Sequence, residues 1–355
     1  MDMVFRIDLE ELRPGMVLGE NVFWENRLLL PKGTIAKASY VDYLACRGIK
    51  KVTVSAEQRY LDELIANPVE KLYAETYVAA GNLINQLKNG ATVRAQKVYQ
   101  IIESIQRTLQ NGEDAVLLLT SFGGKCEYFY SHSLDVCIYC LITAKAMGLS
   151  QAETQELGAA ALLHDVGKTK IPEAILQKDT KLSVDEFNII MAHPSYGYGM
   201  VRKILDMGEG VAQAVQQHHE REDGSGYPKA LKGFQIHPAA RVIAIADMYD
   251  ALISDKVYRK KVLPHEAAEY LLCISNTKID AEIARTFLQH IAIYPKGCEV
   301  LLSTNEVAIV ADPNPSMPLR PVVKVITDSN RNSLKQPFLL ELETNHSVFV
   351  VEIFN

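Results

Sequence analysis

The chain has 355 residues, of which 48% are hydrophobic and 23% charged, so it is typical of a soluble globular protein and too long for one compact core. The net charge of −6 argues against DNA or RNA as a partner, because nucleic-acid binding needs a basic surface. The first residues lack the order of a signal peptide, and no apolar run reaches membrane-spanning length. We therefore expect a cytoplasmic protein without membrane insertion.

Residues 1–57 are expected to form a β-rich accessory domain. Hydrophobic alternation over Val4–Ile7 predicts a strand, and Arg27–Ile35 has the pattern of strand, turn and strand. A last strand over Lys50–Val54 is expected to close the unit.

Residues 58–114 are predicted to be a helical connector. Apolar residues recur at helical spacing in two stretches, Leu72–Leu87 and Val98–Leu109. One interpretation is a packed helical hairpin that leads into the next domain. The other is a helix pair that forms a dimer or transmits a signal, and the sequence leaves both open.

Residues 115–293 are predicted to be helical, and residues 294–355 to be a short β-rich appendage. In the appendage, short apolar runs alternate with Asn, Pro and Ser turns. These runs cover residues 299–302, 307–310, 322–326, 338–342 and 348–351. The expected fold class is therefore mainly α, with an all-α helical domain between a small β-rich N-terminal domain and the C-terminal appendage.

Six scattered cysteines fit a reducing compartment. Cys137 and Cys140 have the spacing of a redox or zinc motif, but no second motif of this kind completes a zinc site. Both lie in a helical pattern over Ser131–Met147, so we predict buried structural cysteines.

The strongest chemical signal is the pair His164 and Asp165 inside the apolar stretch Gly158–Lys168. Burying these polar groups is unfavourable without compensation, and a divalent metal is the usual one. Other His and Asp residues also stand at apolar helix positions. The predicted metal ligands are His132, His164, Asp165, His193, His218, His219 and Asp247.

This many ligands suits two divalent transition-metal ions, and Asp165 could bridge them with its two oxygens. Two ions about 3.5–4 Å apart can clamp the attacking and leaving oxygens of a phosphoester. Mixed imidazole and carboxylate ligands favour Fe, Mn, Zn, Ni or Co over Mg or Ca. Lys168 could neutralise a phosphate oxygen, or it could be a lysine that stabilises a helix C-terminus. Asp165 and Lys168 are the predicted catalytic residues.

A glycine-rich loop, residues 220–228, follows the histidine pair directly. Glycines permit tight turns, Pro228 stiffens the exit, and Tyr227 offers a stacking face or a hydroxyl. Beside two candidate ligands, this loop is predicted to form a wall of the site. Gly226, Tyr227 and Pro228 are therefore candidate substrate-binding residues.

His164-Asp165, Gly167-Lys168 and the run Asp223–Pro228 resemble the signature of the HD-GYP family, a branch of the HD metal-dependent phosphohydrolases. The spacing of the other candidate ligands is similar to that family too, over residues 115–293. The N-terminal β-rich segment resembles an accessory domain often found ahead of HD-GYP domains. The resemblance implies an HD-type all-α domain with a bi- or trinuclear site, often of iron or manganese.

The resemblance also implies hydrolysis of the bacterial second messenger cyclic di-GMP to pGpG, sometimes onward to GMP. The seven His and Asp residues would be metal ligands, and Lys168 would contact the scissile phosphate. Lys256 and Arg259 would hold phosphates or bases of the nucleotide.

The chain departs from the family pattern at two places. Trinuclear members carry a Glu one helical turn before the first ligand, where this chain has Tyr128, so two ions rather than three are expected. The family usually has Arg and Pro where Lys256 and Val257 stand. Lys keeps the charge but loses the bidentate hydrogen-bonding fork.

The sequence thus predicts a cyclic di-GMP phosphodiesterase. The alternatives are a phosphodiesterase for cyclic GMP-AMP or a mononucleotide, and a catalytically silent nucleotide-binding signalling module. A homodimer and protein partners that contact the β domains are also compatible with the pattern.

Overall fold

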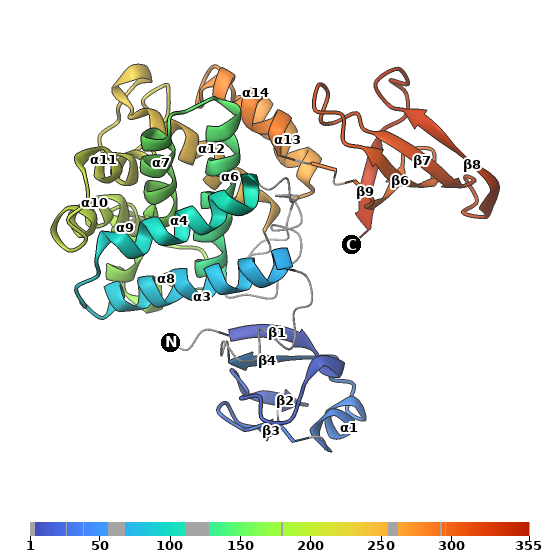
Figure 1. Ribbon diagram of the computed structural model, residues 1–355, viewed down its shortest axis with the longest axis horizontal. Helices are drawn as coiled ribbons and strands as arrows, with labels where there is room; N and C mark the ends of the chain where they lie inside the picture. Colours follow the sequence, from blue (N-terminus) through green and yellow to red (C-terminus); the bar gives the residue numbers. More distant parts are fainter. Residues whose placement is uncertain are drawn as a thin grey trace.

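The computed structural model describes residues 4–25, 27–37, 39–55, 68–110, 128–178, 180–254, 262–291, 293–294 and 296–354. Figure 1 shows a small β-containing unit at the N-terminus, a large group of helices, and a separate sheet at the C-terminus. The mainly α fold class with strands at both ends is confirmed.

The N-terminal unit contains two antiparallel strand pairs, a 3₁₀ helix η1 (Leu9–Glu11) and a short helix α1 (Ser39–Ala45). Strand β1 (Val4–Asp8) pairs with β4 (Lys51–Ser55), so the predicted closing strand is confirmed.

The middle of the N-terminal unit differs from the prediction. Strand β3 (Arg27–Leu30) pairs with β2 (Val22–Trp24), not with a strand that ends at Ile35. Ile35 instead forms one isolated bridge with Val17. The chain reverses at Glu25, whose φ of 47° is left-handed, and the sequence shows no glycine there to signal the turn.

The described part of the connector consists of helices α3 (Pro68–Lys88) and α4 (Ala95–Gln110). Aromatic contacts join α3 to both of its neighbours. The ring centroids of Phe5 in β1 and Tyr77 lie 5.4 Å apart, and those of Tyr77 and Tyr130 in α6 lie 6.4 Å apart. Helix α3 therefore packs between the N-terminal unit and the helical domain.

The helical domain begins with α6 (Tyr128–Ala146), α7 (Gln151–Leu163) and the 3₁₀ helix η2 (Val166–Lys170). Its remaining described helices are α8 (Glu173–Leu176), α9 (Val184–Ile190), α10 (His193–Lys203), α11 (Glu209–Gln217), η3 (Gly233–Gln235), α12 (Pro238–Ile253), α13 (Pro264–Ile274) and α14 (Ala281–His290). Local signals explain several starts: Ser150 and Ser183 form capping boxes with a glutamate three residues later, and α12 and α13 begin at a proline.

Cys137 and Cys140 are fully buried in α6, which confirms that they are packed inside the domain. The Cys137 Sγ lies 3.4 Å from the carbonyl oxygen of Gly158. Among the described residues, no helix combines the length and apolar character needed to cross a lipid bilayer.

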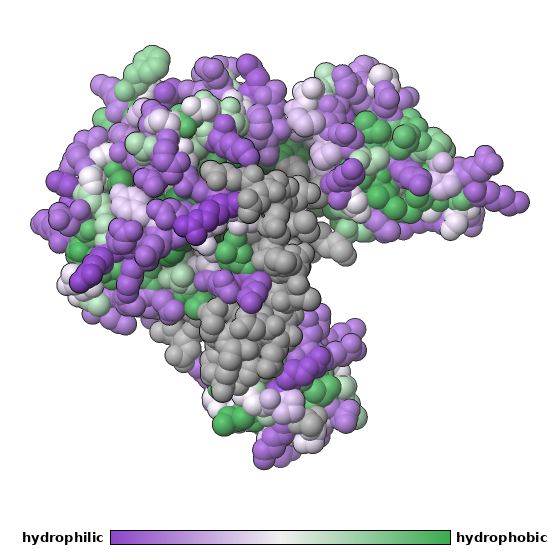
Figure 2. Space-filling view, in the orientation of Figure 1, coloured by the Kyte–Doolittle hydropathy of each residue, from purple (hydrophilic) through white to green (hydrophobic). Residues whose placement is uncertain are grey.

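The C-terminal unit is an antiparallel sheet in the order β8-β7-β6-β5-β9. Its strands are β5 (Glu299–Leu302), β6 (Val307–Asp312), β7 (Val322–Thr327), β8 (Ser333–Glu341) and β9 (Val350–Phe354). Each predicted apolar run thus overlaps a strand, although β8 begins five residues before the run at 338–342 and β9 begins two residues after the start of the run at 348–351. Figure 2 shows hydrophobic residues on the visible face of this sheet, and Phe338 and Leu339 of β8 are exposed.

Candidate metal centre

The seven His and Asp residues singled out from the sequence come from different helices and meet inside the helical domain. His132 lies on α6 and Asp247 on α12, whereas the others lie at helix ends. His164 and Asp165 connect α7 to η2, His193 is the first residue of α10, and His218 and His219 follow α11 directly.

Gly167 lets two of these segments approach each other. A Cβ at this position would lie 2.0 Å from the carbonyl oxygen of His193. Gly167 lies within η2 and has no left-handed φ, so it is not required for a turn. Its role is instead to bring η2 against α10, which places Asp165 next to His193.

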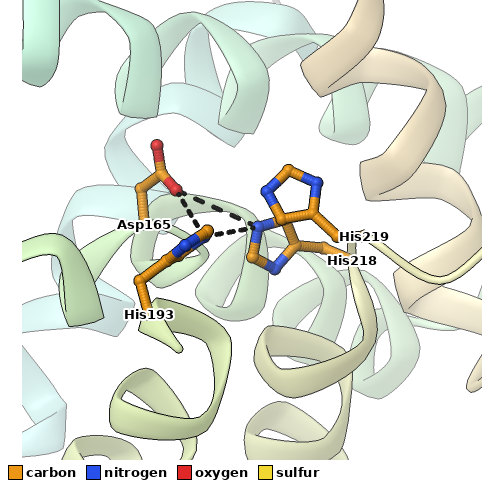
Figure 3. A group of neighbouring side chains, drawn as sticks. All are labelled: Asp165, His193, His218 and His219. Carbon is orange, nitrogen blue, oxygen red and sulfur yellow. Dashed lines mark hydrogen bonds and ion pairs between the residues drawn. The ribbon is translucent and has the colours of Figure 1, made fainter. Parts of the chain in front are cut away.

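The side chains form two groups whose potential ligand atoms lie within 4.8 Å of one another. The first group is Asp165, His193, His218 and His219, and the second is His132, His164 and Asp247. Figure 3 shows the first group, with Asp165 and the imidazoles of His193 and His218 pointing at one another.

Asp165 faces both groups with different oxygens. Its Oδ1 lies 3.2 Å from Nε2 of His193 and 3.9 Å from Nε2 of His218. Its Oδ2 lies 3.5 Å from Nε2 of His164 and 3.7 Å from Nε2 of His132. One carboxylate could therefore bridge two ions.

The hydrogen bonds of the histidines show why this cluster fits metal ions. Nδ1 of His164, His193 and His218 lies within 2.7–2.8 Å of a backbone carbonyl three residues earlier, so Nδ1 carries the proton. With Nδ1 as the donor, the Nε2 lone pairs of His193 and His218 face each other at 3.3 Å. A cation between them would turn this repulsion into ligation.

The electrostatics favour the protonation states that a metal requires at His164, His218, His219 and Asp165. At His132, by contrast, burial lowers the pKa, but hydrogen bonds to Asp247 and Asp250 raise it to about 10. Burial lowers the pKa of His164, lowers that of His218 further, and lowers that of His219 to about 3. Although burial opposes ionisation, the charge of Lys168 and the hydrogen bond with His193 hold the pKa of Asp165 well below its usual range. Neutral imidazoles and ionised carboxylates are the forms that bind metal.

Lys168 pairs with Oδ2 of Asp165, and its side chain is 26% exposed. Asp247 and His219 are 13% and 17% exposed, whereas His164 and His218 are fully buried. The centre therefore opens to solvent on the side of Lys168, His219 and Asp247, which is where a substrate could reach it.

The loop after α11 is held against the centre. The ring of Tyr227 stacks on His219, with centroids 4.7 Å apart. Gly226 packs so closely that a Cβ would lie 2.4 Å from the backbone of residues 220 and 221, which explains this glycine without a ligand. Pro228 is exposed at the loop exit and follows a cis peptide bond.

Sequence reasoning missed the groups that brace this loop. The buried carboxylate of Glu220 accepts the backbone N–H groups of Lys229 at 2.7 Å and of Leu231 at 3.0 Å. Arg241 of α12 donates to Glu222 at 2.7 Å and also pairs with Asp280. The position of Glu220 beside the histidine pair was the only local signal of its role.

We expect Glu220→Ala to lower the free energy of unfolding by about 1–3 kcal/mol, because two backbone donors lose their buried acceptor. Urea denaturation followed by circular dichroism measures this change. Ser225→Ala, in the exposed part of the same loop, is the control and should change stability by less than about 0.5 kcal/mol. Equal stability of both variants would contradict the bracing role.

Three positions of interest cannot be placed. Lys256 and Arg259 lie outside the described residues. Tyr128 is the first residue of α6, but its side chain is outside the described part.

Comparisons with known proteins agree with this geometry. The HD domain family matches residues 123–283, and the KOW domain associated with HD domain matches residues 299–355. The Cyclic di-GMP phosphodiesterase PA4108 of Pseudomonas aeruginosa is 31% identical over 256 residues, which are 72% of this chain and 61% of that protein.

Two further matches extend the comparison. The 3'3'-cGAMP-specific phosphodiesterase 2 of Vibrio cholerae is 33% identical over 164 residues, 45% of this chain and 31% of that protein. The chain thus spans less than two thirds of these relatives. The solved structure of Bd1817, a HDG"Y"P protein from Bdellovibrio bacteriovorus, covers 80% of this chain and 98% of its own with a TM-score of 0.52 and 18% identity, which shows the fold.

The expected HD-type fold is therefore confirmed, with the predicted His and Asp cluster at its centre and the Gly-Tyr-Pro loop stacked against it. The chain belongs to the HD-GYP family of HD-domain proteins.

Proposed function

We propose that the chain is a metal-dependent phosphodiesterase that hydrolyses cyclic di-GMP to pGpG. The observation that carries this proposal is the bridging position of Asp165, whose two oxygens face two separate ligand groups. When bound, two transition-metal ions would supply Lewis acidity and an activated water for attack on a phosphodiester.

The residues of the chain have separate tasks in this proposal. The seven His and Asp side chains would hold the two ions, and Asp165 faces both ligand groups with its two oxygens. Lys168 stands at the open side with its ammonium next to Asp165, so it can contact a phosphate oxygen and stabilise the negative charge that develops there. Tyr227 presents its ring beside His219 and lines the entrance.

We infer iron or manganese as the metal, with zinc, nickel and cobalt as the alternatives, because imidazole and carboxylate together suit these ions. Two ions match the two ligand groups that the described residues form. Tyr128 at the position of the family's additional Glu favours two ions over three. Lys256 and Arg259 are proposed to contact the nucleotide.

The test is chromatographic analysis of the products of cyclic di-GMP and the anaerobically purified, Fe(II)- or Mn(II)-loaded full chain. Accumulation of pGpG is expected, and rapid conversion to GMP would contradict the two-ion site. Absence of any product from cyclic di-GMP would refute the proposed substrate.

Cyclic GMP-AMP is the second candidate substrate, because the chain resembles a curated cGAMP-specific phosphodiesterase over 45% of its length. A competition experiment with equal concentrations of both cyclic dinucleotides separates the two candidates. Preferential loss of cyclic di-GMP supports the proposal, and preferential loss of cyclic GMP-AMP assigns the second substrate.

A further inference from the structure

The histidines of the centre differ in how their second ring nitrogen is held. Three of them use backbone carbonyls as acceptors, and His132 uses a side chain. Nδ1 of His132 lies 2.6 Å from Oδ2 of Asp250, a carboxylate outside the seven predicted ligands.

The helical position of His132 explains this exception. His164, His193 and His218 stand at helix ends, where carbonyl groups are free to accept a side-chain donor. His132 lies inside α6, where the carbonyl groups of the preceding turn already accept helical hydrogen bonds. An acceptor for its Nδ1 must therefore come from another element.

Helix α12 supplies this acceptor and a ligand together. Asp247 and Asp250 are three residues apart, so both lie on the same face of the helix. Asp247 Oδ1 lies 3.2 Å from Nε2 of His132, while Asp250 holds Nδ1 on the opposite edge of the ring. One helix thus fixes both nitrogens of the same imidazole.

Asp250 is buried and has further support. Its side chain is 3% exposed, and Ser254 Oγ donates to Oδ2 at 3.3 Å. Asp135 lies nearby on α6 and accepts the hydroxyl of Tyr73 at 2.6 Å. Burial and the charge of Asp250 raise the pKa of Asp135 well above its usual range, which disfavours a second negative charge beside Asp250.

We propose that Asp250 is a positioning residue that orients His132 toward the ion held by His132, His164 and Asp247. A carboxylate behind a ligating histidine fixes its tautomer and ring orientation and makes it a better donor to the metal. This inference rests on the proposed function only in requiring that the centre binds metal. The other ligand group contains neither His132 nor a contact with Asp250, so only one of the two ions should depend on it.

The test is titration of the metal-free full chain with Mn(II), followed by isothermal calorimetry and by competition with a chelator. The wild type should bind two ions. Asp250→Asn keeps an oxygen acceptor but removes the charge. It should lower the affinity of the protein for one Mn(II) ion by about 10–100-fold and leave the affinity for the other ion unchanged. Asp250→Ala removes the acceptor as well and should lower the affinity for the same ion further.

Tyr249→Phe is the matched control, because Tyr249 is the neighbouring buried residue on α12 and packs on Tyr139 and Phe287 instead of His132. It should leave both affinities unchanged. Selective weakening of one ion by the Asp250 variants supports the proposal. Unchanged affinity for both ions, or equal weakening of both, overturns it.

This experiment contains no nucleotide, so its result is separate from that of the product analysis. If the wild type binds two Mn(II) ions but cleaves no cyclic dinucleotide, the proposed function fails while the role of Asp250 is still measured.

Discussion

Asp165→Asn is expected to remove metal from both ligand groups and to lower turnover of cyclic di-GMP by more than about 100-fold. The side chain is 2% exposed, and its two oxygens face histidines of both groups. Removing one partner from a buried charged cluster costs about 3–5 kcal/mol, which corresponds to at least a 100-fold loss of affinity. Metal analysis of the dialysed protein and chromatography of the nucleotide products measure both effects.

The control for this substitution is Asp185→Asn, which changes an exposed carboxylate on α9 in the same domain. Both variants should keep the helical circular dichroism of the wild type. An Asp165→Asn protein that retains two equivalents of metal and full turnover would rule out the bridging role of Asp165.

The sequence was sufficient to find the members of the cluster because each stands in an otherwise apolar helix pattern. His164 and Asp165 follow a run of buried alanines and leucines, and Asp247 interrupts a helix that is apolar on almost every side. The structure brings all seven together, and their role as metal ligands stays a proposal.

The sequence did not show how the seven residues divide into two groups. That division depends on the angles at which α6, α10 and α12 cross, and side-chain packing sets these angles. The same limit applies to Arg241, whose partners Glu222 and Asp280 are 19 and 39 residues away. Ion pairs between distant segments leave no periodic signal along the chain.

Asp250 could have been identified from the sequence, because it is also a carboxylate in an apolar helix. It lies one turn after Asp247 in the same apolar helix, so the argument applied to Asp247 applies equally to it. The helix ends were the weakest part of the prediction. His193, for example, begins α10 with Pro194 in the first turn, only three residues after the end of α9.

Acid is expected to destabilise the metal-free protein, with a loss of about 1–3 kcal/mol in the free energy of unfolding between pH 7 and pH 5.5. Burial lowers the pKa of His218 well below its usual range and that of His219 to about 3, and it also lowers the pKa of His164. In the unfolded chain these histidines titrate near 6.5. The unfolded state therefore binds more protons in this interval, and stability falls as the pH falls.

His132 has the opposite effect and adds stability as the pH falls. Although burial lowers its pKa, the hydrogen bonds to Asp247 and Asp250 raise it to about 10. The stability it contributes is complete below about pH 6.5 and is lost as the pH rises toward 10. A histidine that stays neutral in the folded state loses about 1.3 kcal/mol of stability between pH 7 and 5.5, whereas His132, protonated at both pH values, gains about 0.8 kcal/mol and offsets part of one lowered group.

Asp165 and Asp247 do not contribute to the change in the free energy of unfolding between pH 7 and 5.5. For both, burial opposes ionisation, but neighbouring histidines, and Lys168 for Asp165, hold the pKa well below its usual range. The stability they contribute is present above about pH 4 and is lost only in stronger acid. The change between pH 7 and 5.5 therefore comes from the histidines and from Asp135, whose pKa burial raises well above its usual range and which adds stability as the pH falls.

Urea denaturation of chelator-treated protein at the two pH values measures this difference. His219→Gln should reduce the loss by about 1.3 kcal/mol, because one neutral buried imidazole is removed. His346→Gln, at an exposed position near the C-terminal sheet, should leave the loss unchanged. Stability that rises on acidification would mean that the buried histidines are protonated at neutral pH. Since metal must then displace these protons, that result would predict a weak, strongly pH-dependent affinity for metal.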